Sequence, residues 1–321
     1  MVDVTSLTNE KLLKKAEEGD LSAIYAYAER LLSSDDPQKQ EEACGWLIHG
    51  AAMHHAPSIR LLGKAYEEGR GIRHSLHEAA RLYASAAEKG DVEAQYRMGL
   101  CSLKGQGTDQ DFEAAARWFE RAAKKDHIES MHNIAVLKEK GIGTEEDYTG
   151  ALQWYEKAAA RGDVSSMNRI ATEFARNGDY EEAVSWYWRS AQEGNPSAMF
   201  NLASCYQKGS GTKRDTEKAF YWYGKAAGLG NVSAMYNLGV CYAKGIDTEQ
   251  DLSKASEWFK KAADGGDEES RKLYEFCQSK IEEAEENTEE EEEEVKPLER
   301  VKSRFMNLKD KLNRKRHRDS F

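Results

Sequence analysis

An internal repeat is the feature that most constrains what this chain can fold into. The stretch NPSAMFNLASCYQKG at residues 195–209 returns as NVSAMYNLGVCYAKG at residues 231–245, 36 positions later. Self-similarity at a period of roughly 20–50 residues is typical of repeat architectures, in which each repeat is one supersecondary unit. Such units bury their apolar faces against their neighbours. The sequence therefore predicts a row of similar modules rather than a fold built around a single active site.

The repeated stretch itself predicts a helix. Ala234, Leu238 and Tyr242 recur at spacings of four, which places them on one helix face. Gly239 follows the leucine, and its small size lets a neighbouring helix come close. Gly245 ends the stretch, as a glycine C-terminal cap does.

A second helix follows in each copy. In the last copy it reads DLSKASEWFKKAADGG, where Asp251 is the predicted N-cap and Ala255, Trp258 and Ala262 follow at helical spacing. The same register runs through the earlier copies, and the tryptophan column contains Trp46, Leu82, Trp118, Trp154, Trp186 and Trp222. The fixed register predicts that these tryptophans belong to the core. Trp188 is out of register and is predicted to lie on the surface.

Glycine pairs separate the two helices, because a sharp corner favours the positive φ angles that glycine allows. The pairs are Gly69 and Gly71, Gly105 and Gly107, Gly141 and Gly143, and Gly209 and Gly211. We predict seven units, beginning near Asp20, His55, Asp91, His127, Asp163, Asn195 and Asn231. A lone second helix before the first unit and a lone first helix after the last are predicted to cap the array.

Charge, hydropathy and cysteine positions argue against a membrane protein and against a protein held by disulfide bonds. The formal net charge is −11, the mean hydropathy is −0.80, and no apolar run approaches the ~18–20 residues that span a bilayer. The N-terminal residues lack a signal peptide's apolar core, so we expect a soluble, cytoplasmic protein. Cys101, Cys205 and Cys241 share one repeat position, and packed helices lie roughly 10 Å apart. Because a disulfide needs Cα atoms within about 7 Å, these thiols are expected to stay reduced.

The repeated sequences of the two helices resemble the Sel-one-like repeat (SLR) family, relatives of the tetratricopeptide repeat. The resemblance covers about residues 10–281 and depends on A-x-x-x-L-G-x-x-Y, G-x-G and D-x-x-x-A-x-x-W-x-x-x-A recurring in fixed register. It implies an all-α, right-handed α/α superhelix of about seven two-helix repeats, whose first helices line a concave groove that binds a partner protein or peptide. The first unit lacks the glycine pair, and the fifth, 32 residues long, departs toward a tetratricopeptide repeat.

The predicted domains follow from these boundaries. They are a capping half-repeat at 1–19, the solenoid at 20–266, a capping helix at 267–281, an acidic linker at 282–297 and a basic amphipathic segment at 298–321.

Three columns of residues are predicted to face the groove, by analogy with tetratricopeptide repeats. The first column lies two residues before the position of Leu238 and its equivalents in the other repeats. It contains Tyr25, Arg60, Tyr96, His132, Asn168, Phe200 and Tyr236. One residue before the Leu238 position stand Arg97, Asn133, Arg169, Asn201 and Asn237. Near the helix end stand Lys104, Lys140, Arg176, Lys208 and Lys244. Amides can bond a peptide backbone and cations can bind carboxylates. Two alternatives stay open: the helix dipole alone favours a cation in the last turn, and the aromatic column could be partly buried.

No motif predicts an enzyme, a cofactor or a metal site. The phosphate loop G-x-x-x-x-G-K-[ST], H-E-x-x-H and paired C-x-x-C motifs are absent, and the histidine pairs lack a third ligand in register. Some secreted SLR proteins are described as β-lactamase-like, but they carry paired cysteines in each repeat. Ser210 and Lys213 match S-x-x-K by spacing only. A β-lactamase-like hydrolase is therefore the alternative to a non-enzymatic scaffold or adaptor.

The last forty residues form two charged segments, the first acidic and the second basic. Residues 282–294 contain ten glutamates, a self-repelling run expected to be disordered or a frayed helix. It could cover either the basic tail or the basic groove column. The following segment is basic and carries an apolar stripe at Leu298, Val301, Phe305, Leu308 and Leu312. Four roles stay open for 298–318: docking on a partner or on the solenoid, binding an anionic membrane, binding nucleic acid or serving as a nuclear address, or remaining a solvated tail.

Overall fold

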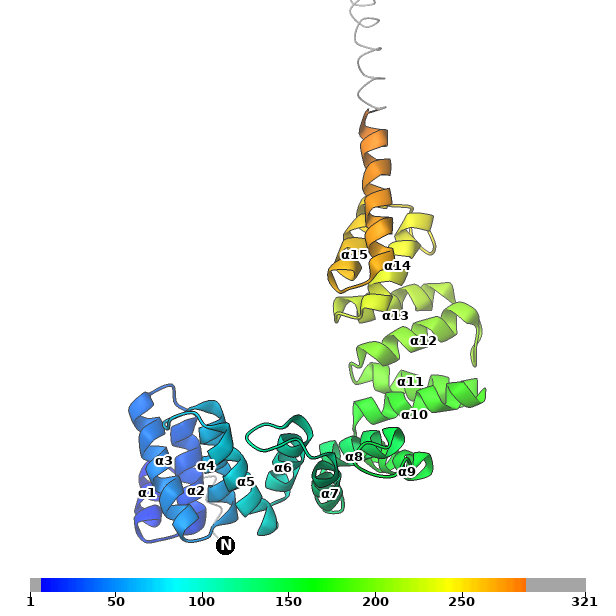
Figure 1. The fold of residues 1–321 in the computed structure, drawn as a ribbon. Helices are drawn as coiled ribbons and strands as arrows, with labels where there is room; N and C mark the ends of the chain where they lie inside the picture. Colours follow the sequence, from blue (N-terminus) through cyan, green and yellow to red (C-terminus); the bar gives the residue numbers. More distant parts are fainter. Residues whose placement is uncertain (1–6, 287–321) are drawn as a thin grey trace, which may run out of the picture. The chain divides into compact units, whose positions relative to one another are not determined.

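The computed structural model describes residues 7–286, and Figure 1 shows their arrangement. Within these residues every regular element is an α-helix, as the sequence predicts. The chain divides into two compact units, Met1–Glu173 and Phe174–Phe321. The second half of the predicted acidic run and the basic segment 298–321 lie outside the described residues.

The first unit is a series of helix pairs. In it α2 packs on α3, α4 on α5, α6 on α7 and α8 on α9, and each pair packs on the next. The helices are α1 (Asn9–Glu17), α2 (Leu21–Leu32), α3 (Pro37–Ala52), α4 (Ala56–Glu68), α5 (Leu76–Glu88), α6 (Val92–Lys104), α7 (Phe112–Ala123), α8 (Ile128–Lys140), α9 (Tyr148–Ala160) and α10 (Val164–Asn177), whose last residues belong to the second unit.

The second unit repeats this arrangement, with α11 packed on α12, α12 on α13, α13 on α14 and α14 on α15. A further helix begins at residue 268 and continues to the last described residue. The labelled helices are α11 (Tyr180–Gln192), α12 (Pro196–Lys208), α13 (Thr216–Gly228), α14 (Val232–Lys244) and α15 (Leu252–Asp264).

Close packing within a helix pair depends on small residues in the first helix. A Cβ atom added to Gly239 would lie 2.7 Å from the ring of Phe259, and one added to Gly99 would lie 2.5 Å from Phe119. Both phenylalanines are fully buried. The prediction that Gly239 lets a neighbouring helix approach is therefore confirmed, and the neighbour is the second helix of the same repeat.

The prediction that the tryptophans belong to the core holds in part, since Trp46, Trp118 and Trp154 pack against the core clusters from their edge. Each tryptophan of the column is only half-buried, and the residue after it fills the core instead, as Phe119, Tyr155, Tyr187, Tyr223 and Phe259 do. Successive residues of a helix point about 100° apart, so the two positions cannot share one face. The indole faces instead meet cations three residues on, at Arg121, Lys157, Arg189 and Lys261, 4.1–4.9 Å from the ring centroids. Trp188 is exposed, as predicted.

The glycine pairs join each repeat to the one before it. The first glycine of a pair ends the first helix in the left-handed conformation, as Gly141 does with φ 61°. The second has a positive φ as well, and a Cβ atom at Gly143 would lie 2.1 Å from the carbonyl oxygen of Phe112, at the start of α7. The turn thus stacks directly on the second helix of the preceding repeat. Asp247 replaces this glycine in the last repeat, at φ 54°, and accepts a hydrogen bond from Thr216.

The cysteines and the helix caps agree with the sequence analysis. All five cysteines are buried and free. Burial raises the pKa of Cys44, Cys101 and Cys241 to about 11, so these thiols stay protonated at neutral pH. Asp251 accepts a hydrogen bond from the backbone N–H of Lys254, which makes it the N-cap of α15.

Candidate functional site

The column of aromatic and polar residues lies on the first helix of each repeat, directly above the buried aromatic residue of the second helix. The ring centroids of Tyr96 and Phe119 are 6.0 Å apart, and those of Phe200 and Tyr223 are 5.7 Å apart. His132 and Tyr236 contact the equivalent rings of their own repeats. Every residue of this column is half-buried. The aromatic column therefore covers the core and is also partly exposed, so the alternative that it is partly buried holds.

In the first unit this column forms ion pairs between neighbouring repeats. Arg60 on α4 lies 3.2 Å from the carboxylate of Asp91, which caps α6, and also donates to the hydroxyl of Tyr25 on α2 at 3.3 Å. His132 on α8 lies 3.2 Å from Asp163, at the start of α10. Each contact fastens one repeat to the next, so Arg60 and His132 already have carboxylate partners within the chain.

Glu93 links two further repeats. Its carboxylate lies 3.3 Å from Nε2 of His127, the N-cap of α8, and 2.9 Å from Nε of Arg97 on its own helix. The hydrogen bond with His127, together with Arg97, lowers the pKa of Glu93 to about 2. Glu93 therefore stays ionised far below neutral pH, and the charge of Arg97 is compensated locally.

Glu139 on α8 connects the core to the surface. It accepts a hydrogen bond from the buried Tyr155 hydroxyl at 2.7 Å and forms an ion pair with Arg169 of the next repeat. The Arg169 hydrogen bond lowers the pKa of Glu139, while burial raises the pKa of Tyr155. In the same unit Tyr83 donates to Glu67 at 2.6 Å.

These tyrosine–carboxylate pairs escaped the sequence analysis, although the sequence contains a signal for them. Tyr83, Tyr155 and Tyr223 each have a Glu or Gln sixteen residues earlier, at Glu67, Glu139 and Gln207, which accepts the hydroxyl hydrogen bond. Where the buried ring is Phe119 or Phe259, the residue sixteen positions earlier is apolar, Leu103 or Ala243. In these five repeats a hydroxyl and its acceptor thus occur together or not at all, because a buried hydroxyl requires a partner. Tyr187 of the shorter repeat does not follow this spacing, since the residue sixteen positions earlier is Ala171.

The second unit has a neutral version of the same surface. Asn201 and Asn237 stand where the first unit has Arg97 and Arg169, and Gln207 stands in the place of Glu139. The amide of Asn237 donates to the backbone carbonyl of Ser233 one turn earlier. The inter-repeat ion pairs of the first unit therefore have no counterpart at these two asparagine positions.

The lysine column is exposed throughout. Lys104, Lys140, Lys208 and Lys244 each occupy the last position of a first helix, directly before the left-handed glycine cap. None of these four ammonium groups forms an ion pair within residues 7–286. Arg176 is exposed at the equivalent position of α10, and Asn133 and Asn168 are half-buried on α8 and α10. The lysines therefore keep their charge available to a partner.

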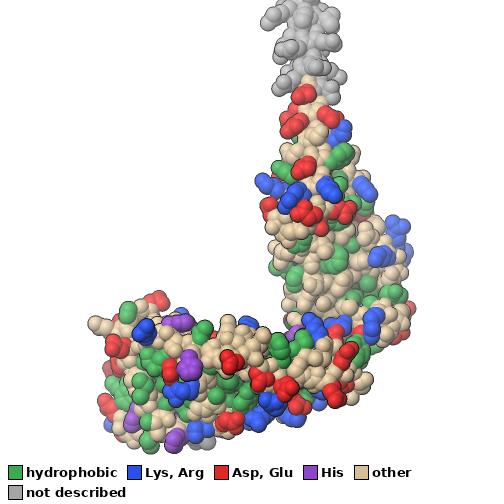
Figure 2. Space-filling view, viewed as in Figure 1, with side chains coloured by type: hydrophobic (Ala, Val, Ile, Leu, Met, Phe, Trp, Pro, Cys, Tyr) green, Lys and Arg blue, Asp and Glu red, His purple; other side chains and the backbone are tan. Residues whose placement is uncertain are grey.

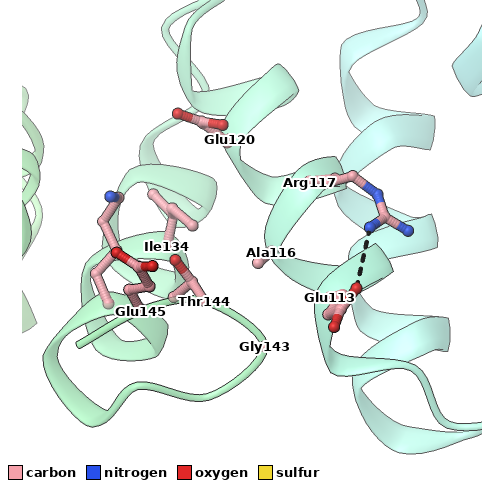
Figure 3. Close-up of a pocket in the computed structure, with 9 residues that line it drawn as sticks. Glu113, Ala116, Arg117, Glu120, Ile134, Gly143, Thr144 and Glu145 are labelled. Carbon is pink, nitrogen blue, oxygen red and sulfur yellow. Dashed lines mark ion pairs between the residues drawn. The ribbon is translucent and has the colours of Figure 1, made fainter. Parts of the chain in front are cut away.

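Two hollows open near these columns in the first unit. One, of about 270 Å³, lies between α2 and α4 and has Leu32, Leu61 and Ala65 among its lining residues, together with the charged Glu29, Lys64, Glu68 and Arg70. The other, of about 590 Å³, lies between α7 and the turn after α8 (Figure 3). In Figure 3 the ion pair of Glu113 and Arg117 faces Thr144 and Glu145 across the opening. Both hollows mix acidic and basic groups, as does the face of the molecule in Figure 2.

Within residues 7–286 no three His, Cys, Asp or Glu side chains come together as a metal site. Ser210 lies in the turn between α12 and α13, and Lys213 beside it is exposed. None of the helices in the described range is long and apolar enough to cross a membrane.

Comparison with known proteins agrees with the architecture. The Sel1 repeat family model matches residues 56–91, 92–127, 128–163, 166–195, 196–231 and 232–267. The first predicted unit lies outside these matches, although α2 and α3 form a helix pair there. A comparison with curated proteins found no match.

Two solved structures are similar over most of the chain. The Sel1 repeat protein of Oxalobacter formigenes is 31% identical, with a TM-score of 0.66 over 73% of this chain and 96% of that protein. The protective antigen c5321 of uropathogenic Escherichia coli, which displays an SLR fold, is 27% identical, with a TM-score of 0.76 over 84% of this chain. This chain spans 59% of that antigen's length. The repeats matched in sequence and the fold shared with these structures together show that the chain belongs to the Sel1 repeat family.

Proposed function

We propose that this chain is a non-enzymatic scaffold that binds an acidic segment of a partner protein on the first-helix face of a unit, the surface that the three columns described above form within that unit. One observation supports this most directly: Lys104, Lys140, Lys208 and Lys244 stand at matching positions, exposed and without ion pairs in residues 7–286. Elsewhere on this face the chain supplies its own carboxylates, as Asp91 does for Arg60. The lysines are the cations on this face whose carboxylates a partner would provide.

The neighbouring columns supply the rest of the binding surface. Half-buried rings such as Phe200 and Tyr236 offer apolar contact area that is already held by the core beneath. The amides of Asn201 and Asn237 can bond an extended peptide backbone, which presents one donor and one acceptor per residue. Aromatic residues are common energetic anchors of interfaces, and charged residues at the rim set orientation and association rate.

The test uses the full chain as bait in a cell lysate, with mass spectrometry as readout. In the test variant the four lysines of the column become alanine. The matched control replaces four exposed lysines away from the column, Lys89, Lys124, Lys225 and Lys260, so that the net charge changes equally. We expect a partner that wild type and control capture and the test variant does not, with capture weakening as salt rises. A partner held equally by all three proteins would contradict the proposal.

A further inference from the structure

One repeat lacks the tryptophan that the other predicted repeats carry. In the second repeat Leu82 on α5 occupies the column of Trp46, Trp118, Trp154, Trp186, Trp222 and Trp258. A hollow of about 410 Å³ lies beside it, lined by α3, α4 and α5, which pack against one another in the first unit (Figure 1). We therefore compare the position of this hollow with that of the indole ring in another repeat.

The repeat of Trp154 provides this comparison. Leu82 precedes Trp154 by two repeats, and Ala51, Ile59 and Leu62 of the hollow precede Ala123, Met131 and Ile134 by the same two repeats. Trp154 packs against the core cluster that contains Ala123, Met131 and Ile134. Three residues of the cluster against which Trp154 packs thus have equivalents in the lining of the hollow beside Leu82, whose side chain is smaller than an indole.

The rim of the hollow carries a large exposed apolar side chain. Ile48 lines it and is 51% exposed; the same position carries Glu120 beside Trp154 and Glu156 beside Trp186, and Ala84, Trp188 and Gly224 beside Trp118, Trp222 and Trp258. Met53, directly before the lining residue His54, is 57% exposed. Large exposed side chains of this kind, next to an apolar hollow, are typical of a binding site.

The lining also has a cation for an aromatic guest. In four other repeats an Arg or Lys three residues after the tryptophan lies 4.1–4.9 Å from the indole centroid. Here that position is Ser85, which is too short to cover the hollow, but Arg81 lines it from the side. Its guanidinium is largely exposed and lies 2.8 Å from Glu78 on the same helix, within reach of a ring that enters the hollow.

We infer that this hollow binds an aromatic side chain, of the size of an indole, presented by a partner protein. The guest takes the place that the chain's own tryptophan takes in the other repeats, and Arg81 stacks on it. The site lies on the second-helix side of the first unit, apart from the lysine column. The test of this site and the test of the proposed function can therefore give different results.

The first test titrates the full, methyl-labelled chain with indole and follows the methyl signals by NMR. We expect saturable shifts at Ile48, Leu62 and Leu82. Leu82→Trp, which restores the tryptophan of the other repeats, should abolish them. Ile48→Glu, copied from the pattern of Glu120 and Glu156, should weaken binding at least tenfold and covers the case in which Leu82→Trp does not fold. Trp154→Leu together with Glu120→Ile should create a second hollow and add indole shifts at Ile134.

The second test asks whether the guest comes from a protein. Random peptides displayed on phage are selected on the full chain and counter-selected on Ile48→Glu, and on Leu82→Trp where it is folded. Enriched peptides should share a Trp, Phe or Tyr and bind wild type at least tenfold more tightly than the variants. The inference is overturned if indole produces no saturable shift or the same shift in Ile48→Glu. Indole binding with enriched peptides that lack an aromatic residue would overturn the assignment to a partner protein.

Discussion

At the scale of single residues, buried tyrosines such as Tyr83 and Tyr155 pair their hydroxyl with an acceptor on the first helix of the same repeat. Tyr83 is 1% exposed, and its hydroxyl donates to Glu67. Phe119, one repeat later, has Leu103 at the equivalent position and needs no acceptor. Glycine precedes both pairs on the first helix, as Gly63 and Gly99, so the packing beneath the two rings is otherwise similar.

This comparison predicts the outcome of an exchange between the two repeats. Glu67→Leu alone should lower the free energy of unfolding by about 1–3 kcal/mol, because it leaves the Tyr83 hydroxyl buried without its acceptor. The double variant Glu67→Leu with Tyr83→Phe should recover most of that loss, since Leu103 and Phe119 already form this combination. Urea titration followed by circular dichroism measures both values. A double variant that is less stable than the single one would refute the pairing.

The contacts of Glu93 with His127 and Arg97 predict that the stability of the fold decreases at acidic pH. Its pKa is about 2 in the folded chain against an ordinary value of 4.5, so the folded state favours the ionised form. For a lowered acid pKa the stabilisation is present above the unfolded pKa and is lost as pH falls through the folded one. The difference in Tm between wild type and Glu93→Gln should therefore shrink between about pH 4.5 and pH 2.

The control for this titration is Glu113→Gln, which removes one exposed carboxylate that faces Arg117 at 3.6 Å. A Tm difference for Glu93→Gln that stays constant across the window, or one that Glu113→Gln reproduces, would show that the pair with His127 and Arg97 does not stabilise the fold.

At the scale of elements, the glycine turns decide how one repeat stacks on the next. Gly143→Ala should destabilise the chain in two ways, through its φ of 65° and through the 2.1 Å approach of its Cβ atom to the Phe112 oxygen. Gly162 supplies the matched control, because its φ is 94° and nothing lies within 4 Å of the added atom. Gly162→Ala should cost about 1–2 kcal/mol, and Gly143→Ala clearly more. Equal losses in thermal unfolding would mean that the turn does not press on α7.

The helices themselves could be predicted, because spacings of four and capping glycines such as Gly245 are local signals. The sequence did not identify the most deeply buried aromatic residue of the second helix. Trp118 and Phe119 are both apolar, and the pattern does not show which of two adjacent positions lies deeper in the core. The ion pairs of the candidate surface could not be predicted for another reason. Arg169 and Glu139 are 30 residues apart, and their contact depends on how two repeats stack, which no local pattern records.

At the scale of the whole molecule, a run of glutamates follows the lysine column along the chain. Residues 282–294 contain ten glutamates, and within residues 7–286 Lys208 and Lys244 form no ion pair. The proposed partner segment is acidic, so the run has the chemistry to compete for the same column. Attraction between exposed charges is screened within about 10 Å at moderate salt. Contact between the run and the lysines should therefore occur at low salt only.

Acetylation rates of individual lysines, read by mass spectrometry, test this contact without a known partner. The test variant changes the six glutamates of residues 289–294 to glutamine in the full chain. At low salt Lys208 and Lys244 should react faster in the variant than in wild type, because the carboxylates that cover them are gone. Lys39 and Lys124, on second helices and beside their own acids Asp36 and Glu120, should react alike in both proteins. High salt should remove the difference, and equal rates at low salt would place the glutamate run away from the lysine column.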